Sequence, residues 1–196
     1  MKTSMNISVN NRAELLQEIG PGIARQMTEV LQKLTAEKIE VKFGAVQTLE
    51  ENKVLVDIGE KCFGSFVNFS CPETELEGVA VLFFPLSSIE VLTKLLLKRY
   101  LGKLGGGEAD SKIKLSAFKE ATNILLTGYI SAIANTLEMK FRTSVPKFVR
   151  FRNFEFLRPG LVQGCSRPDR SACIGQFGIT GPGGGSVIKG LFISAF

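Results

Sequence analysis

The chain has 196 residues, of which 44% are hydrophobic, so it is long enough to bury one sizeable core or two small halves that share one. It contains no histidine, which excludes the usual general base, the Ser/His and Cys/His nucleophile pairs and the commonest metal ligand. Its net charge of +5 favours an acidic partner, without choosing between a protein and a nucleic acid.

The sequence shows neither a membrane span nor a secretion signal. No apolar run approaches the length of a membrane helix, and the first residues, MKTSMNISVNNRAELL, lack the apolar centre of a signal peptide. The cysteines lack the CxxC spacing of zinc or redox sites, so we expect reduced structural thiols at Cys62, Cys71, Cys165 and Cys173. A cytoplasmic protein without a bound metal and without a membrane partner is therefore expected.

The first predicted element is helical. Asn11, followed three residues later by Glu14, resembles a capping box and predicts that a helix starts there. Gly20, Pro21 and Gly22 interrupt it, and apolar periodicity resumes over residues 23–34. The pattern predicts either two helices or one helix with a kink.

Strand patterns follow. Alternation and β-branched residues predict an antiparallel meander with strands at residues 39–46, 53–60, 62–69 and 78–85. An amphipathic helix is then predicted over residues 89–101, opened by Ser87 or Ser88. Three glycines at residues 105–107 indicate a hinge between two halves.

The second half repeats this order. A long helix is predicted over residues 113–137, and strands are predicted at residues 144–151, 154–159, 172–179 and 186–196. Glu14 and Glu120 are 106 positions apart, and so are Gly22 and Gly128, which suggests an internal duplication. We therefore predict a single α+β domain, residues 1–196, with pseudo-two-fold repeats at about 10–104 and 108–196. Long helices would pack on one face of a continuous, mainly antiparallel sheet.

The long helix of the second half carries the candidate site. At 100° per residue, one stripe gathers four polar side chains within roughly 60°, while the apolar side chains lie opposite. The polar stripe is Ser116, Glu120, Asn123 and Thr127, and the apolar one is Phe118, Ala121, Leu125, Tyr129 and Ala132. Such a stripe is ordinarily just the solvated side of a helix, but here it presents a carboxylate and a carboxamide about one turn apart.

A longer pattern gives this stripe its specificity. The spacing Ser116-x3-Glu120-x2-Asn123-x22-Pro146, in the context LSAFKEATNI, resembles the signature of the CheC, CheX and FliY family of bacterial chemotaxis phosphatases. The resemblance implies a CheC-like enzyme that hydrolyses the aspartyl phosphate of the response regulator CheY in two-component signalling.

The resemblance also implies roles for single residues. Asn123 would orient the attacking water, and Glu120 would pair with the regulator's active-site lysine. Ser116 and Thr127 would touch the partner, whereas Pro146 would shape the following strand. This chain would bind no cofactor of its own, because the magnesium would belong to the phosphorylated regulator.

The first half carries a degenerate copy of the site. Glu14 keeps the carboxylate, but Gln17 replaces the asparagine, so a working second site is not the favoured reading. Family members are known with one site or with two. Some bind the deamidase CheD through another surface, and both a monomer and a homodimer remain open.

Two other functions compete with hydrolysis. One is a scaffold like the middle domains of flagellar switch proteins, which bind partners without catalysis. The other is single-stranded nucleic-acid binding through the basic and aromatic residues 147–158. Basic and aromatic residues that alternate along a segment are also typical of an ordinary strand with one buried face. Because the strand is the favoured interpretation, we expect no nucleic-acid partner.

Overall fold

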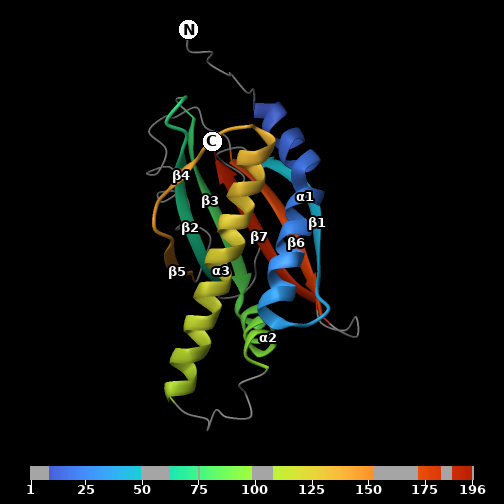
Figure 1. The fold of residues 1–196 in the computed structure, drawn as a ribbon, viewed down its shortest axis with the longest axis vertical. Helices are drawn as coiled ribbons and strands as arrows, with labels where there is room; N and C mark the ends of the chain where they lie inside the picture. The colour runs from blue at the N-terminus through green and yellow to red at the C-terminus, as the bar shows by residue number, and fades with distance from the viewer. Residues whose placement is uncertain are drawn as a thin grey trace.

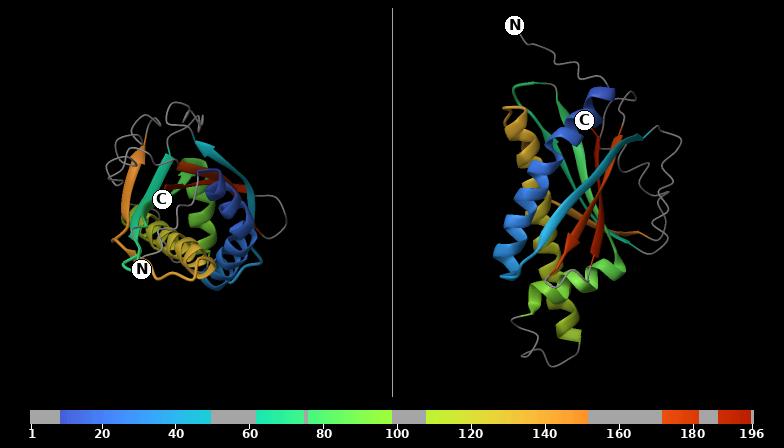
Figure 2. Two further views of the ribbon diagram at one scale, coloured as in Figure 1. Left: turned by 90° about the horizontal axis from the view of Figure 1, so that it is seen from above. Right: turned by 90° about the vertical axis from the view of Figure 1, so that its right-hand side faces the viewer.

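The computed structural model describes residues 9–49, 62–74, 76–98, 108–151, 172–181 and 187–195. These form three helices and seven strands (Figure 1): α1 (Val9–Thr35), β1 (Glu40–Leu49), β2 (Cys62–Ser70), β3 (Glu77–Pro85), α2 (Leu86–Leu97), α3 (Glu108–Thr136), β4 (Arg142–Thr143), β5 (Lys147–Phe151), β6 (Ala172–Thr180) and β7 (Val187–Ala195). Helices α1 and α3 lie side by side on one face of the sheet (Figures 1 and 2). The predicted α+β class with long helices on one face is confirmed.

The strands pair across the two halves of the chain. Their order is β1-β6-β7-β3-β2-β4, with β5 also paired to β2, and every pairing between described strands is antiparallel. The outer strand β1 joins the β6–β7 hairpin of the second half, and β5 joins the β2–β3 hairpin of the first. The pairing is therefore symmetric about the β3–β7 contact. The duplication that this symmetry suggests stays a prediction.

Helix α1 is one continuous helix with Pro21 inside it, so the alternative of two helices is wrong. The helix begins at Val9, which places Asn11 within it and rules out Asn11 as the N-cap. A Cβ on Gly20 would lie 2.3 Å from Cδ1 of Phe43 in β1. Gly20 therefore serves close packing of helix on strand and does not end the helix.

Helix α2 lies across one end of the sheet (Figure 2). Its N-cap residue is Pro85 in an extended conformation, with φ −55° and ψ 148°, so the prediction that Ser87 or Ser88 opens the helix is wrong. Pro85 is also the last residue of β3, and its fixed φ sets the turn from the strand into the helix. Ser88 is buried within the first turn of the helix.

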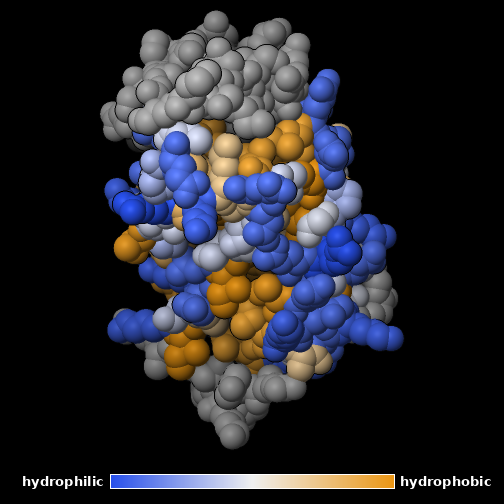
Figure 3. All heavy atoms as spheres, turned by 45° about the horizontal axis from the view of Figure 1, so that its top comes forward, coloured by the Kyte–Doolittle hydropathy of each residue, from blue (hydrophilic) through white to orange (hydrophobic). Residues whose placement is uncertain are grey.

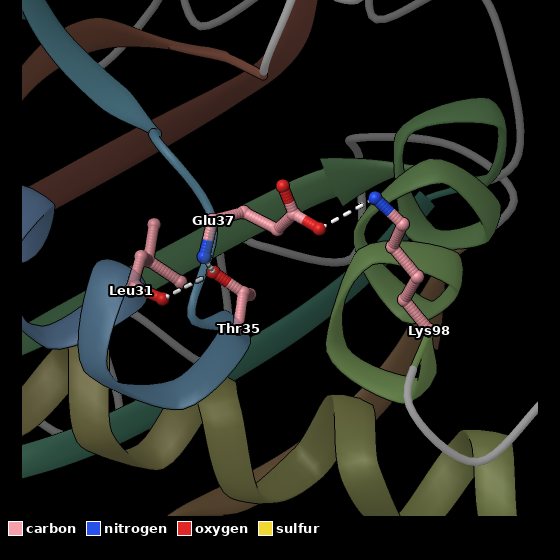
Figure 4. A network of polar contacts seen from close by, with 4 residues as sticks. All are labelled: Leu31, Thr35, Glu37 and Lys98. Atoms are coloured by element: carbon pink, nitrogen blue, oxygen red, sulfur yellow. Dashed lines mark hydrogen bonds and ion pairs between the residues drawn. The ribbon is translucent and has the colours of Figure 1, made fainter.

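Polar contacts tie the end of α2 to the end of α1 (Figure 4). Lys98 Nζ lies 2.5 Å from Glu37 Oε1, and the backbone N–H of Glu37 donates to Thr35 Oγ1 at 3.2 Å. The Thr35 hydroxyl in turn donates to the carbonyl of Leu31 at 2.7 Å. The Lys98 side chain is 62% exposed, so the ion pair contributes on the order of 1 kcal/mol or less.

The core lies between the helices and the sheet. Phe84 of β3 packs edge to face on Phe118 of α3 and on Phe177 of β6, with ring centroids 5.4 and 5.5 Å apart. The predicted apolar stripe of α3 is buried at Phe118, Ala121, Leu125 and Tyr129, and half-buried at Ala132. This buried stripe fixes the rotation of α3 and turns its opposite side outward.

Several predicted features lie outside the described residues. They are the strands at 53–60 and 154–159, the glycine hinge at 105–107 and Cys165. The described parts of the predicted strands at 39–46, 62–69, 78–85, 144–151, 172–179 and 186–196 all contain strand. None of the described helices is both long and apolar enough to cross a membrane.

Candidate functional site on helix α3

The four polar residues of the predicted stripe share the outward side of α3. Ser116, Glu120 and Thr127 are exposed, and Asn123 is half-buried. Because Leu125 and Tyr129 anchor the opposite side in the core, the helix holds Glu120 and Asn123 about one turn apart on a rigid support. The spacing therefore predicts correctly that these four residues share one side of the helix, and their roles stay a prediction.

Asn123 departs from the expectation that its side chain faces solvent. Its Oδ1 is buried and has no hydrogen-bond partner among the described residues. An unsatisfied buried carbonyl costs about 1–3 kcal/mol relative to a bonded one. The amide is therefore held partly out of water with one hydrogen-bonding position unused.

A lysine and an aromatic ring border the stripe, and the sequence pattern did not identify them as a pair. Lys119 of α3 places Nζ 5.3 Å from the ring centroid of Phe148 in β5. Phe148 is half-buried and packs against Phe63 of β2, with centroids 6.1 Å apart. Residues 147–151 form strand β5 and pair with β2, which confirms that this segment is a strand, with Lys147 and Arg150 exposed.

Pro146 precedes β5 directly, as predicted for a residue that shapes the entry to that strand. Two residues earlier, the backbone N–H of Ser144 donates to the carbonyl of Asn68 at 2.8 Å, and Ser144 Oγ accepts from the backbone N–H of Asn68 at 3.0 Å. These bonds fasten the segment between α3 and β5 to β2. Pro146 is half-buried.

The counterpart residues on α1 are differently engaged. Glu14 is exposed, whereas Gln17 Oε1 accepts a hydrogen bond from the backbone N–H of Val46 at 2.8 Å. The register of β1 shifts between Phe43 and Val46, so this bond satisfies a backbone donor at an irregularity of the strand. Gln17 therefore joins α1 to β1 through its side-chain carbonyl, whereas the side-chain carbonyl of Asn123 has no partner among the described residues.

The exposed face around α3 mixes charged and apolar groups. In the space-filling view, hydrophobic residues gather between hydrophilic ones on the drawn face of the molecule (Figure 3). Ile113 and Leu115, in the first turns of α3, are 43% and 42% exposed. Large apolar side chains thus lie on the same helix as the polar stripe.

No group of three or more His, Cys, Asp or Glu side chains that could hold a metal ion occurs within the described residues. Cys62 and Cys71 are free thiols, and both are buried, as is Cys173. Burial raises the pKa of the Cys62 thiol, which keeps it protonated and unreactive. Among the described residues, the chemistry available on α3 is that of a carboxylate, an amide, hydroxyls and a lysine.

Comparisons with known proteins agree with this reading of the helix. The CheC-like family matches residues 113–150, a segment that contains Ser116, Glu120, Asn123 and Pro146. A search of curated proteins gave no match. The family match and the folds of the solved structures below confirm the resemblance to CheC, CheX and FliY proteins.

Solved structures share the fold over almost the whole chain. FliY of Thermotoga maritima is 21% identical, with a TM-score of 0.69, covering 94% of this chain and 88% of its own. The chemotaxis protein CheX of Desulfovibrio desulfuricans is 12% identical, with a TM-score of 0.55, covering 90% and 97%. FliM in the FliG–FliM complex of H. pylori is 15% identical, with a TM-score of 0.58, covering 93% and 91%. At these identities the structures establish a common fold.

Proposed function

We propose that this CheC-like chain is a phosphatase that hydrolyses the aspartyl phosphate of a chemotaxis response regulator of the CheY kind. The observation that carries the proposal is the outward side of α3, where Glu120 and Asn123 stand about one turn apart within the matched segment. The absence of histidine fits a reaction that needs no general base and no nucleophile from the enzyme.

The reaction is a displacement at phosphorus. The oxygen of a water molecule attacks the phosphorus in line, and the bond from phosphorus to the aspartyl oxygen breaks. The electron pair stays with the regulator's carboxylate, and the two protons of the water end on the phosphate. Acyl phosphates are reactive, so correct placement of the water supplies most of what the catalyst must contribute.

Each site residue has one task in this proposal. Asn123 orients the attacking water through its amide, and its unpaired Oδ1 is available to accept from that water once the side chain turns outward. Glu120 pairs with a lysine of the regulator and fixes the register of the two proteins. The magnesium ion is carried by the regulator as part of the substrate.

The surroundings of the pair suit a protein partner. Ser116 and Thr127 are exposed one turn to either side and contact the regulator in this proposal. Ile113 and Leu115 offer apolar area for a partner to cover. CheD stays a second proposed partner, through a surface away from α3, and the chain acts as a monomer or a homodimer.

Phosphate release tests the proposal. The purified chain, mixed with a phosphorylated response regulator and magnesium, is expected to speed release of inorganic phosphate over the regulator's own rate. The variant Asn123→Ala should lose this effect and keep its circular dichroism spectrum. If the wild-type chain binds the regulator but leaves the release rate unchanged, the enzyme assignment is wrong.

A non-catalytic scaffold is the second candidate. It is favoured by the similarity to FliM, whose structure was solved in a complex with FliG. A scaffold would hold a response regulator or a flagellar switch component through the same face of α3 without hydrolysis. Retained regulator binding by both wild type and Asn123→Ala, with no phosphate release by either, would favour it.

A further inference from the structure

Lys119 lies beside the proposed catalytic pair, Glu120 and Asn123, and the mechanism proposed above does not use it. It precedes Glu120 directly and comes one turn before Asn123. On a helix Lys119 is rotated by about 40° from Asn123, and Glu120 is rotated by about 60° to the other side. Asn123 therefore stands between a cation and an anion on the outward side of α3.

The position of the Lys119 side chain is held by an aromatic group. Its Nζ lies 5.3 Å from the ring centroid of Phe148, within the range of a cation–π contact. Phe148 packs on Phe63, and Phe63 packs edge to face on Phe118, with centroids 5.3 Å apart. The ammonium thus rests on a chain of packed rings that reaches the core.

Among the described residues, no carboxylate forms an ion pair with Lys119. The ion pairs between described residues join Lys42 to Glu40 and Lys98 to Glu37, and neither involves Lys119. The Lys119 residue is half-buried, and an incoming anion gains more at a partly desolvated lysine without a described carboxylate partner than at a fully hydrated one.

We propose that Lys119 is a third residue of the α3 site, whose ammonium binds the anionic oxygens of the acyl phosphate placed against Asn123. This inference rests on the phosphatase function proposed above. The substrate brings a doubly charged phosphoryl group to the side of the helix from which Lys119 projects. The ammonium leaves the Phe148 ring readily, since a cation–π contact of a solvent-accessible lysine is weak compared with a contact to a phosphoryl oxygen.

Lysine suits this task because its flexible stem carries a compact charge. The anionic oxygens are present both in the bound substrate and in the transition state, so Lys119 binds both. Loss of the charge should therefore raise KM more than it lowers kcat.

The competing explanation is structural. Lys119 covers Phe148 and so holds the edge strand β5 against α3. In that case its replacement would change the stability of the fold but not the dependence of hydrolysis on regulator concentration.

Two matched variants separate the explanations. Lys119→Met removes the charge and keeps an apolar stem over Phe148. Lys114→Met removes the same charge from an exposed residue of the same helix, rotated by about 140° from Lys119. Phosphate release is measured for wild type, both variants and Lys119→Arg over a range of phosphorylated regulator concentrations, and thermal unfolding is followed for each.

We expect Lys119→Met to raise KM by about tenfold and Lys114→Met to change it less than twofold. Lys119→Arg should restore most of the loss, and added salt should raise KM less in Lys119→Met than in wild type. Equal kinetics of the two methionine variants, with or without a lower unfolding temperature for Lys119→Met, overturn the inference and leave the proposed function standing. A wild-type chain without activity overturns both.

Discussion

Two side-chain amides, Asn123 on α3 and Gln17 on α1, stand 106 positions apart at corresponding places of the two predicted repeats, and they are engaged differently. Gln17 is longer by one methylene and reaches β1, where its carbonyl accepts the Val46 N–H at 2.8 Å. Asn123 leaves its carbonyl buried without a described partner. The first amide stabilises the fold, and the second keeps an unused acceptor that the proposed role in orienting water would employ.

Replacement of Asn123 tests the catalytic amide. Asn123→Ala is expected to lower the rate of phosphate release by about 10² to 10³, by analogy with the loss of a single oxyanion-hole donor. Its stability should be unchanged or slightly higher, because the variant removes a buried carbonyl that lacks a bond. Phosphate release and urea unfolding measure the two effects. A variant that unfolds at clearly lower urea would contradict this account of the carbonyl.

Replacement of Gln17 tests whether this residue stabilises the fold and takes no part in catalysis. Gln17→Ala should destabilise the fold by about 1 kcal/mol through the lost bond to Val46 and lower the unfolding temperature by about 2–4 °C. Phosphatase activity should stay at the wild-type level. Glu18→Ala, an exposed neighbour on the same helix, is the control and should change neither quantity. Reduced hydrolysis by Gln17→Ala would instead show that the first copy takes part in catalysis.

At the level of elements, α1 shows where local sequence rules succeed and fail. Its apolar periodicity correctly predicts the buried side, including Ile23, Met27 and Leu31. The glycines and proline at 20–22 suggest an interruption, because propensity describes the backbone alone. The structure shows that Gly20 faces the ring of Phe43, a contact with a strand more than 20 residues away that no local rule contains.

A matched pair of glycine substitutions measures this contact. In Gly20→Ala the new Cβ would lie 2.3 Å from Phe43 Cδ1, so the ring or the helix must move, at a cost of about 1–3 kcal/mol. In Gly22→Ala nothing lies within 4 Å of the new Cβ, and the variant should be more stable by about 0.4–1 kcal/mol. Urea unfolding of both variants gives the comparison. Equal stabilities would mean that α1 and β1 do not pack this closely.

The same limit applies to the candidate site. Helical spacing was sufficient to place Glu120 and Asn123 on one side of α3, because residues three apart on a helix are neighbours. It could not place Lys119 over Phe148, since that contact joins a helix to a strand across 29 positions. Nor could it show that Gln17 is bonded to β1, or which strands pair. The spacing within one element and the overall layering were predictable, whereas individual contacts between elements were not.

At the level of the whole molecule, the sheet joins the halves crosswise. β1 pairs with β6 over Glu40–Leu49, β5 pairs with β2, and β3 pairs with β7 in the middle. Helices α1 and α3 also pack on one another. Neither half could keep its full set of described strand neighbours if it were separated from the other.

Expression of the halves tests this interdependence. Fragments 10–104 and 108–196 are each expected to lack cooperative thermal unfolding, because the outer strand of each needs a partner from the other. Mixed or co-expressed fragments should associate and recover the circular dichroism spectrum of the intact chain. Size-exclusion chromatography and thermal unfolding provide the measurements. A fragment that is monomeric and unfolds cooperatively alone would contradict the prediction.

The crosswise pairing of β1 with β6 has a consequence for the evolution of the chain. Even if the α1 amide contributes nothing to chemistry, β1 is still required as a neighbour of β6. Natural selection that maintains the Glu120 and Asn123 pair should therefore also maintain β1. A gene deletion that removed the first half would expose the edge of β6, so the first half is needed whether or not it carries a working site.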